Sequence, residues 1–356
     1  MGQHNFEQYR LEAINWVEKH RDFQTEDREQ ETLRVAPREW RPDNISPEKG
    51  ILLVHGLGNS SWDFVDIAPV LANNGFLVRT VLLAGCGTKP SDMLYVTIDD
   101  WRRTIREQIA ILSKEVKDVY LGGFSGGVNL VLEYAMNQPE IKGLLLFSSA
   151  IKAKTFWAFT APVLAKTRKW ALNPKKHPAQ FLYRYINMPT NALKQFYSSS
   201  VSARSLLKKN YYTKPVLIVQ TRHDYIVNSR YILKLFESKF THPDSRLIWY
   251  GDLPAGAKIS SRVLARSDYL PEWKISQFSH SSVLFSPKNE EYGREGRRRF
   301  CWNGQKRGDY EKCLLGEDVW YSDYGYREKG KIHARLTFNP YFEWQAEIML
   351  EVLKSQ

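Results

Sequence analysis

Long apolar runs are absent from this sequence of 356 residues, and cysteine is scarce, with three in all. No stretch reaches the roughly 18 consecutive apolar residues that a membrane-spanning helix requires. The opening residues, Met1 to Asn5, lack both the basic and the apolar region of a secretory signal peptide. We therefore expect a soluble, cytoplasmic protein whose contact with a membrane is at most peripheral.

The three cysteines are too few for a disulfide scaffold, and their spacing does not match a metal site. Cys86 stands alone, whereas Cys301 and Cys313 are twelve positions apart in a polar, glycine-containing stretch. That pair forms either a disulfide, in an oxidising compartment, or two free thiols in a cytoplasmic loop. The sequence leaves both alternatives open and predicts no metal ion.

Acidic residues are missing between Glu140 and Asp224, although the whole chain has 39 of them against 51 Lys and Arg. Thirteen Lys and Arg fall between Lys152 and Lys214, interleaved with eleven aromatic residues. One interpretation is an ordinary solvated surface. The other is attraction for an anionic partner, such as an anionic membrane surface or the head group of a substrate.

Short apolar runs alternate with helical patterns along most of the chain, which predicts an α/β fold with a mostly parallel central sheet and helices on both faces. The predicted strands are residues 50–54, 76–83, 118–121, 143–147, 215–220 and 246–250. The predicted helices are residues 6–23, 63–74, 98–115, 127–137 and 340–353. The basic, aromatic-rich stretch of residues 151–214 interrupts this alternation and is therefore an insertion between two strands.

A G-x-S-x-G pattern around Ser125 lies directly after a predicted strand and directly before a predicted helix. A sharp strand-to-helix turn needs small residues on both sides of the serine, and it leaves the hydroxyl exposed at the helix N-terminus. This context favours Ser125 as a nucleophile. The alternative is a glycine-rich turn with an incidental serine.

A nucleophilic serine needs a histidine base and a carboxylate that orients the imidazole. Asp224 follows the predicted strand 215–220, and His280 lies in a serine-rich segment beyond the last predicted strand. The order Ser125, Asp224, His280 therefore predicts a catalytic triad. Asp252 is the alternative acid, because it also follows a strand.

Acyl transfer also needs two N–H donors for the oxyanion of the tetrahedral intermediate. The glycine-containing turn after the strand 50–54 offers the N–H of Leu57, and Gly126 offers the N–H next to the nucleophile. We interpret His55, in the same turn, as a structural residue and not as a second base.

These motifs together resemble the serine hydrolases of the α/β-hydrolase fold, and within them the carboxylesterase and monoacylglycerol lipase-like group. The resemblance covers about residues 48–285. It rests on the segments 54–58, 83–92 followed by Trp101, 123–127, and 215–219 leading to Asp224. It implies a two-step acyl transfer without a cofactor, and a cap over the catalytic face that corresponds to residues 151–214.

Three features depart from that group. Cys86 stands where such enzymes usually have a histidine, and His280 lies 56 positions after Asp224, so that an insertion at roughly residues 251–273 must loop out. The roughly 75 residues after His280 also exceed the customary closing helix. We expect a division into an N-terminal helix and connector (1–47), a core (48–150 and 215–286), a cap (151–214), a C-terminal insertion (287–339) and a closing helix (340–356).

The function expected from the sequence is hydrolysis of carboxylic esters, of the carboxylesterase, lipase or lysophospholipase type, on a small-molecule or lipid ester. An amidase, peptidase or thioesterase that uses the same triad is the alternative. The basic clusters Lys208-Lys209 and Arg297 to Arg299 allow a nucleic-acid-binding role, but no recognised binding motif accompanies them, so no nucleic-acid partner is expected.

Overall fold

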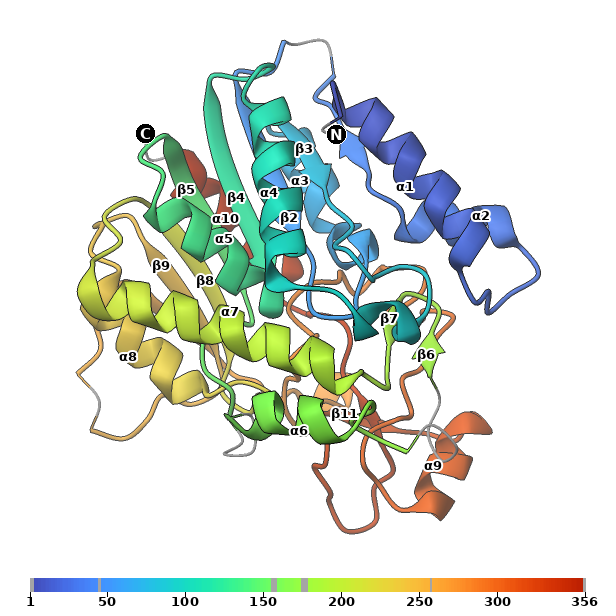
Figure 1. Cartoon of the computed structure of the whole chain (residues 1–356). Coiled ribbons are helices and arrows are strands. Elements are labelled where there is room, and N and C mark those ends of the chain that lie inside the picture. The colour runs from blue at the N-terminus through green and yellow to red at the C-terminus, as the bar shows by residue number, and fades with distance from the viewer. Residues whose placement is uncertain (1–2, 44–45, 155–158, 174–178, 257, 355–356) are drawn as a thin grey trace. The chain divides into compact units, whose positions relative to one another are not determined.

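The computed structural model describes residues 3–43, 46–154, 159–173, 179–256 and 258–354 (Figure 1). The chain forms two compact units. The first consists of Met1–Leu145 and Thr155–Asn210, and the second of Leu146–Lys154 and Tyr211–Gln356. Of the predicted cap, residues 155–210 thus group with the first unit. The stretches 155–158 and 174–178 of this cap lie outside the described residues.

The first unit contains a mostly parallel sheet with the strand order β1-β3-β2-β4-β5. Strand β2 pairs in parallel with β3 and with β4, whereas the short β1 pairs antiparallel with β3. Almost every residue of β2, β3 and β4 is buried, as in a parallel sheet that is covered on both faces. The strands are β1 (Glu39–Trp40), β2 (Lys49–Val54), β3 (Phe76–Thr80), β4 (Asp118–Phe124) and β5 (Ile141–Phe147), in whose last residues the chain enters the second unit.

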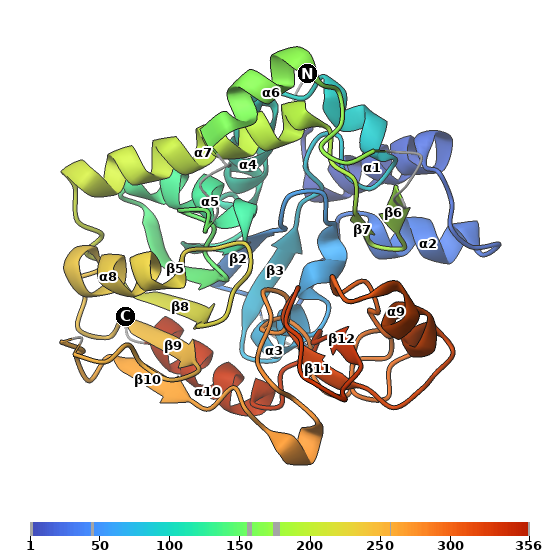
Figure 2. The same ribbon diagram turned by 90° about the horizontal axis from the view of Figure 1, so that it is seen from below.

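Helices cover both faces of this sheet. Figure 2 shows α4, α5 and α7 on one side of β2 and β3 and α3 on the other. Helix α4 begins with a capping box, in which Thr97 and Asp100 satisfy each other's backbone N–H groups. The helices of this unit are α1 (Phe6–His20), α2 (Arg28–Val35), α3 (Ile67–Ala72), α4 (Ile98–Leu112), α5 (Gly126–Met136), α6 (Ala161–Thr167) and α7 (Thr190–Lys209).

Hydrogen bonds to backbone atoms tie the hairpin of β6 (Gln180–Phe181) and β7 (Arg184–Tyr185) to the rest of the first unit. The N–H of Tyr185 donates to Gly58 O at 2.8 Å, and Ser60 Oγ donates to Tyr183 O at 3.0 Å. The guanidinium of Arg21 donates to Leu182 O and forms a buried ion pair of 2.6 Å with Glu31. This part of the predicted cap therefore rests on the turn after β2.

The second unit contains the parallel strands β8 (Val216–Thr221), β9 (Arg246–Tyr250) and β10 (Val263–Arg266). Helices α8 (Ser229–Lys239) and α10 (Phe342–Lys354) lie on opposite sides of β8 and β9 (Figure 2). Strand β10 falls in the stretch 251–273, which the sequence predicts to be a looped-out insertion. Its residues are half-buried or exposed, so the strand lacks the apolar run that would have revealed it.

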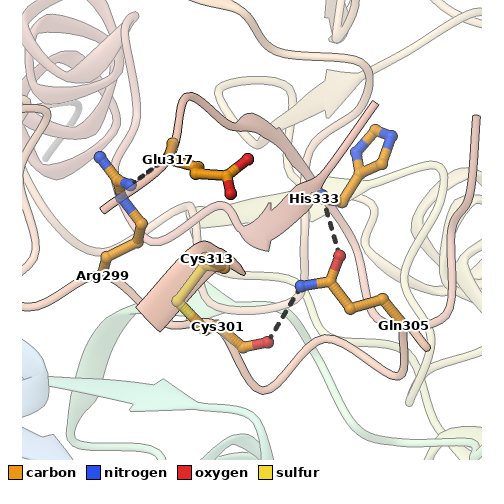
Figure 3. Close-up of a disulfide and its surroundings, with 6 residues drawn as sticks. All are labelled: Arg299, Cys301, Gln305, Cys313, Glu317 and His333. Carbon is orange, nitrogen blue, oxygen red and sulfur yellow. Dashed lines mark hydrogen bonds between the residues drawn. A yellow bond between two sulfur atoms is a disulfide. The ribbon is translucent and has the colours of Figure 1, made fainter. Parts of the chain in front are cut away.

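Residues 287–339 fold as a small disulfide-bonded segment of the second unit, which we call the C-terminal insertion. It contains α9 (Arg307–Leu314) and the paired strands β11 (Trp320–Ser322) and β12 (His333–Arg335). Cys301 and Cys313 form a disulfide (Figure 3). The pair packs with Val319 and Ala334 in a buried cluster. Of the two alternatives left open by the sequence, the structure therefore contains the disulfide.

The predicted strands and helices correspond to observed elements, with one difference that shapes the site. The helix expected over residues 63–74 is a 3₁₀ turn (Ser61–Phe64) followed by α3. The carboxylate of Asp63 accepts hydrogen bonds from Gly56 N and Asn59 Nδ2, which holds this turn against the loop after β2. The α-helix therefore begins only at Ile67.

None of the helices in the described parts of the chain combines the length and the apolar character needed to span a lipid bilayer.

Candidate active site

Ser125 occupies the turn between β4 and α5, with a φ of 52°, in a region that favours glycine. The neighbouring glycines make this turn possible. A Cβ added at Gly127 would lie 2.2 Å from Val54 O, and one added at Gly123 would lie 2.7 Å from Val128 N. Both contacts are too close for any side chain. The G-x-S-x-G spacing is therefore a steric requirement of the turn, and the strain sits on the serine itself.

The two predicted oxyanion donors lie close together in the first unit. A Cβ built on Gly126 would be 3.5 Å from Leu57 N, so the backbone of Leu57 passes directly beside the start of α5. Gly126 is the first residue of that helix, where the N–H groups have no partner within the helix. This arrangement provides N–H groups at a helix N-terminus, which suits a developing negative charge.

His55 is fully buried in the turn after β2 and is held at both ring nitrogens. Its Nε2 accepts the N–H of Leu83 at 3.1 Å, so Nδ1 carries the proton and donates to Gly56 O at 2.7 Å. Burial lowers the pKa of His55 to about 4. A neutral imidazole with both nitrogens occupied agrees with a structural residue.

Cys86 is buried in the turn between β3 and α4. Burial raises the pKa of its thiol to about 12, so the thiol stays protonated and is a poor nucleophile. The hydroxyl of Tyr185 holds this turn. The hydroxyl of Tyr185 accepts the N–H of Thr88 at 2.9 Å and donates to Gly85 O at 3.1 Å.

Asp224 and His280 form a hydrogen-bonded pair in the second unit. His280 Nδ1 lies 2.7 Å from Asp224 Oδ2, and the carboxylate is completely buried. Asp224 Oδ1 accepts the N–H groups of Ile226 and Val227, each at 2.8 Å, and Gln220 Nε2 donates to Oδ2 at 3.2 Å. These bonds hold both oxygens of the carboxylate in place. Oδ2 therefore stays directed toward the imidazole.

Asp252, the alternative acid, lies elsewhere. Its carboxylate is 92% exposed and pairs with Arg222 at 2.6 Å. The imidazole of His280 bonds to Asp224 and not to Asp252. The structure thus brings one of the two candidate acids to the candidate base.

Three hydrogen bonds hold the loop that carries His280. Ser148 Oγ donates to His280 O at 2.7 Å, and Ser279 Oγ donates to Leu336 O at 2.5 Å. Ser276 N donates to Tyr321 O at 2.8 Å. Two of these three partners belong to the C-terminal insertion, whose role the sequence did not indicate.

Another buried carboxyl near this pair was missed by sequence reasoning. Asp323 is 3% exposed, and burial together with the charge of Asp224 raises its pKa to about 7. It lies in a polar and aromatic stretch without periodicity, so no local pattern distinguished it from a surface aspartate. Only the folding of the C-terminal insertion brings it near Asp224.

Comparison with known proteins shows which proteins this chain is similar to. Residues 45–195 match the model of the family described as serine aminopeptidase, S33 (Hydrolase_4). Among solved structures, the chain is similar to one reported for LipS and LipT, two metagenome-derived lipolytic enzymes. The TM-score is 0.52 at 22% identity, over 60% of this chain and 86% of that one. The fold is that of the α/β hydrolases.

Two curated relatives carry esterase and lipase names. A carboxylesterase of Bacillus subtilis is 23% identical over 207 residues, which is 57% of this chain and 82% of the relative. A thermostable monoacylglycerol lipase of a Bacillus species is 30% identical over 102 residues, which is 29% of this chain and 41% of the relative. The comparisons together show the α/β-hydrolase fold for this chain, and these two relatives carry the names of an esterase and a lipase.

Proposed function

We propose that the protein is a serine hydrolase that cleaves carboxylic esters, with Ser125 as nucleophile, His280 as base and Asp224 as the orienting acid. The observation that carries this proposal is the 2.7 Å hydrogen bond between His280 and the completely buried Asp224. A buried carboxylate bonded to an imidazole is the pair that a catalytic serine requires. The strained turn at Ser125 supports the same assignment.

In the first half of the reaction, Ser125 Oγ attacks the ester carbonyl carbon while His280 Nε2 takes the hydroxyl proton. The N–H groups of Leu57 and Gly126 bind the resulting oxyanion. As the C–O bond to the alcohol breaks, the imidazolium returns the proton to the leaving oxygen. The products are the free alcohol and an acyl group on Ser125.

In the second half, His280 Nε2 removes a proton from a water molecule, which attacks the acyl carbon. The bond to Ser125 Oγ breaks, the proton passes to this oxygen, and the carboxylic acid leaves. Asp224 holds the proton of His280 on Nδ1 throughout, so Nε2 is the nitrogen that accepts a proton in each half. The charge on Asp224 also stabilises the imidazolium that forms in each half.

The substrate we propose is a lipid ester with a medium or long acyl chain, such as a monoacylglycerol or a lysophospholipid. Exposed apolar side chains on the predicted cap support this choice, and cationic side chains accompany them. The apolar ones are Phe159, Val163, Leu164 and Leu172, and the cationic ones are Lys166, Arg168 and Lys169. The cap then also contacts an anionic membrane surface.

A fluorophosphonate probe tests the nucleophile directly, because it reacts only with an activated serine. We expect the probe to modify Ser125, as identified by peptide mass spectrometry, and the Ser125→Ala variant to remain unlabelled. Modification of another serine, with Ser125 untouched, would refute the assignment. A series of p-nitrophenyl esters from acetate to palmitate tests the substrate, and maximal turnover of the acetate would exclude the lipid ester.

A peptidase or amidase activity is the second candidate, favoured by the description of the matching family model as a serine aminopeptidase. The same acyl-enzyme chemistry cleaves amides. Turnover of amino-acid p-nitroanilides at a kcat/KM at or above that of the esters would favour this candidate. A thioesterase activity is tested in the same way, by comparing kcat/KM for acyl thioesters with kcat/KM for the esters.

The disulfide between Cys301 and Cys313 supports a proposal about the cellular compartment. The sequence alone predicts the cytoplasm, but disulfides persist chiefly in oxidising compartments, and Cys301 and Cys313 are bonded. An oxidising compartment is therefore the proposed location. Alkylation of cysteines before cell lysis checks it, since both residues should resist modification until a reductant is added.

A further inference from the structure

The C-terminal insertion holds the loop that carries His280 from several positions. Ser276 N donates to Tyr321 O at 2.8 Å before the histidine, and Asn339 N donates to Phe285 O at 2.9 Å after it. Between them, Ser279 Oγ donates to Leu336 O. The insertion is therefore a structural neighbour of the candidate base and not a remote appendage.

The two chain neighbours of Asp323 are Ser322 and Tyr324. Each of them is linked to a residue next to His280 or next to Asp224. On one side, Ser322 O accepts Leu336 N at 3.0 Å, and Leu336 O in turn accepts the hydroxyl of Ser279, next to His280. On the other side, the ring of Tyr324 lies 4.6 Å from the ring of Tyr225, next to Asp224. The chain neighbours of Asp323 are thus linked to segments next to Asp224 and His280, which agrees with the electrostatic effect of both residues on the Asp323 carboxyl.

The backbone around Asp323 is fixed by a residue close to the disulfide. Asn303 Nδ2 donates to Ser322 Oγ at 3.1 Å, and Asn303 O accepts the N–H of Gly325 at 2.9 Å. Asn303 is itself 1% exposed and follows Cys301 by two positions. The disulfide and Asn303 thus hold the turn that presents Asp323.

The charged groups that act on Asp323 come from three segments. Burial and the negative charge of Asp224 favour its protonated form and raise its pKa to about 7. The N–H of Tyr324 and the charges of Arg335 and His280 favour its ionised form. Tyr225 and Tyr324 are the titratable neighbours on the adjoining loops. The Asp323 carboxyl therefore titrates near neutral pH, and a positive charge on His280 favours its ionised form.

On the basis of the proposed triad, we propose that Asp323 is a positioning residue of the active site, a second carboxyl that the C-terminal insertion supplies to His280 and Asp224. Two neighbouring carboxylates repel each other, so a part of Asp323 remains protonated near neutral pH. The ionised form of Asp323 gains population above pH 7. Its charge, together with that of Asp224, then stabilises the imidazolium that forms when His280 takes the proton of Ser125.

The variant Asp323→Asn tests this role, because it keeps the shape of the side chain and removes its charge. We expect kcat for a p-nitrophenyl ester to fall about 3- to 10-fold above pH 7, with KM changed less than about two-fold. The midpoint of the acid side of the kcat/KM profile should move to lower pH, since a nearby negative charge favours protonated histidine. Asp323→Glu, which restores the charge, should recover most of the wild-type profile.

A matched control is available on the same segment. Asp318 is 74% exposed and pairs with Lys274 at 2.6 Å, so Asp318→Asn removes one carboxylate without touching the catalytic pair. Its pH profile should coincide with that of the wild type. If the profile of Asp323→Asn also coincides with the wild type, Asp323 has no positioning role.

A second measurement keeps Asp323 in place and so does not depend on the folding of Asp323→Asn. Carboxyl carbon NMR of the full chain with Ser125→Ala follows the titration of Asp323 without turnover. A midpoint near neutral pH supports the proposal, and a midpoint in the ordinary range of an aspartate, near 4, overturns it. Failure of the proposed triad would appear separately, as a lack of fluorophosphonate labelling at Ser125 in the wild type.

Discussion

Asp224 Oδ2 lies 2.7 Å from His280 Nδ1, and no part of the Asp224 side chain is exposed to solvent. A carboxylate is costly to bury unless its charge is compensated. Here two backbone N–H groups and the amide of Gln220 compensate it together with the imidazole. The bonds at the carboxylate thus hold it in one orientation, with Oδ2 directed at one nitrogen of His280.

The first prediction concerns the choice of acid. We expect Asp224→Asn to lower kcat by on the order of 10⁴, because an amide would hold the imidazole in the wrong tautomer. Asp252→Asn, at an exposed carboxylate that pairs with Arg222, should leave kcat within about two-fold. Steady-state kinetics of both variants decide the matter. A crippled Asp252→Asn beside an active Asp224→Asn would reverse the assignment.

The second prediction concerns the turn at Ser125. A methyl group at Gly127 would meet Val54 O at 2.2 Å, so Gly127→Ala should lower the free energy of unfolding by about 3 kcal/mol and abolish labelling of Ser125. Gly308, in α9, has open space around it. Gly308→Ala should be neutral or stabilise by up to about 1 kcal/mol. Urea unfolding measures both, and equal effects would contradict the steric argument.

The third prediction concerns the disulfide. Replacing both Cys301 and Cys313 by serine should cost about 3 kcal/mol of stability, as expected for a closed loop of this size. Activity should fall as well, because the insertion holds the His280 loop. Thermal unfolding and kcat are measured with and without a reductant. The wild type should respond to the reductant and the double variant should not. An unchanged wild type in reductant would show that the disulfide contributes nothing.

The fourth prediction concerns pH and His55. Its pKa is lowered to about 4 by burial, whereas an unfolded histidine titrates near 6.5. Between these values the unfolded chain binds a proton that the folded chain does not. Stability that is fully present above pH 6.5 is therefore lost as the pH falls toward 4, by up to about 3 kcal/mol.

The variant His55→Gln isolates this contribution from that of the other titrating groups. Glutamine keeps a donor and an acceptor for Gly56 O and Leu83 N but does not titrate. The loss of stability between pH 7 and pH 4.5, measured by urea unfolding, should be smaller in the variant. An equal loss in both proteins would exclude His55 as its source.

The fifth prediction concerns the membrane. Sedimentation with vesicles of phosphatidylglycerol should recover more protein than with vesicles of phosphatidylcholine, and added salt should reduce the difference. The pair Lys166→Glu and Lys169→Glu, on the predicted cap, should abolish it. The pair Lys114→Glu and Lys117→Glu makes the same charge change at exposed positions after α4 and should not. Equal losses in both pairs would point to net charge alone.

Local sequence patterns predicted most of the fold. Buried runs such as residues 50–54 and 246–250 are apolar because parallel strands are covered on both faces, and they correspond to β2 and β9. Strand β10 escaped this approach because it lies at the sheet edge and its residues are not deeply buried. The helix predicted over 63–74 was wrong at its start, since Asp63 bonds to the loop before it.

The candidate site likewise has residues that the sequence predicted and relations that it did not. The amino-acid sequence by itself indicated the turn at Ser125. A strained backbone with close neighbours tolerates only glycine at positions 123 and 127, and this pattern lies within five consecutive residues. It also supplied Asp224 and His280 as candidates in the expected order.

Only the tertiary structure decided which carboxylate meets His280, whether Cys301 and Cys313 are joined, and where Asp323 lies. These relations depend on contacts between segments that are distant in the chain, and no periodicity or spacing encodes such contacts. Burial and neighbouring charges then set how each of these side chains behaves, since both arise only when the segments pack together.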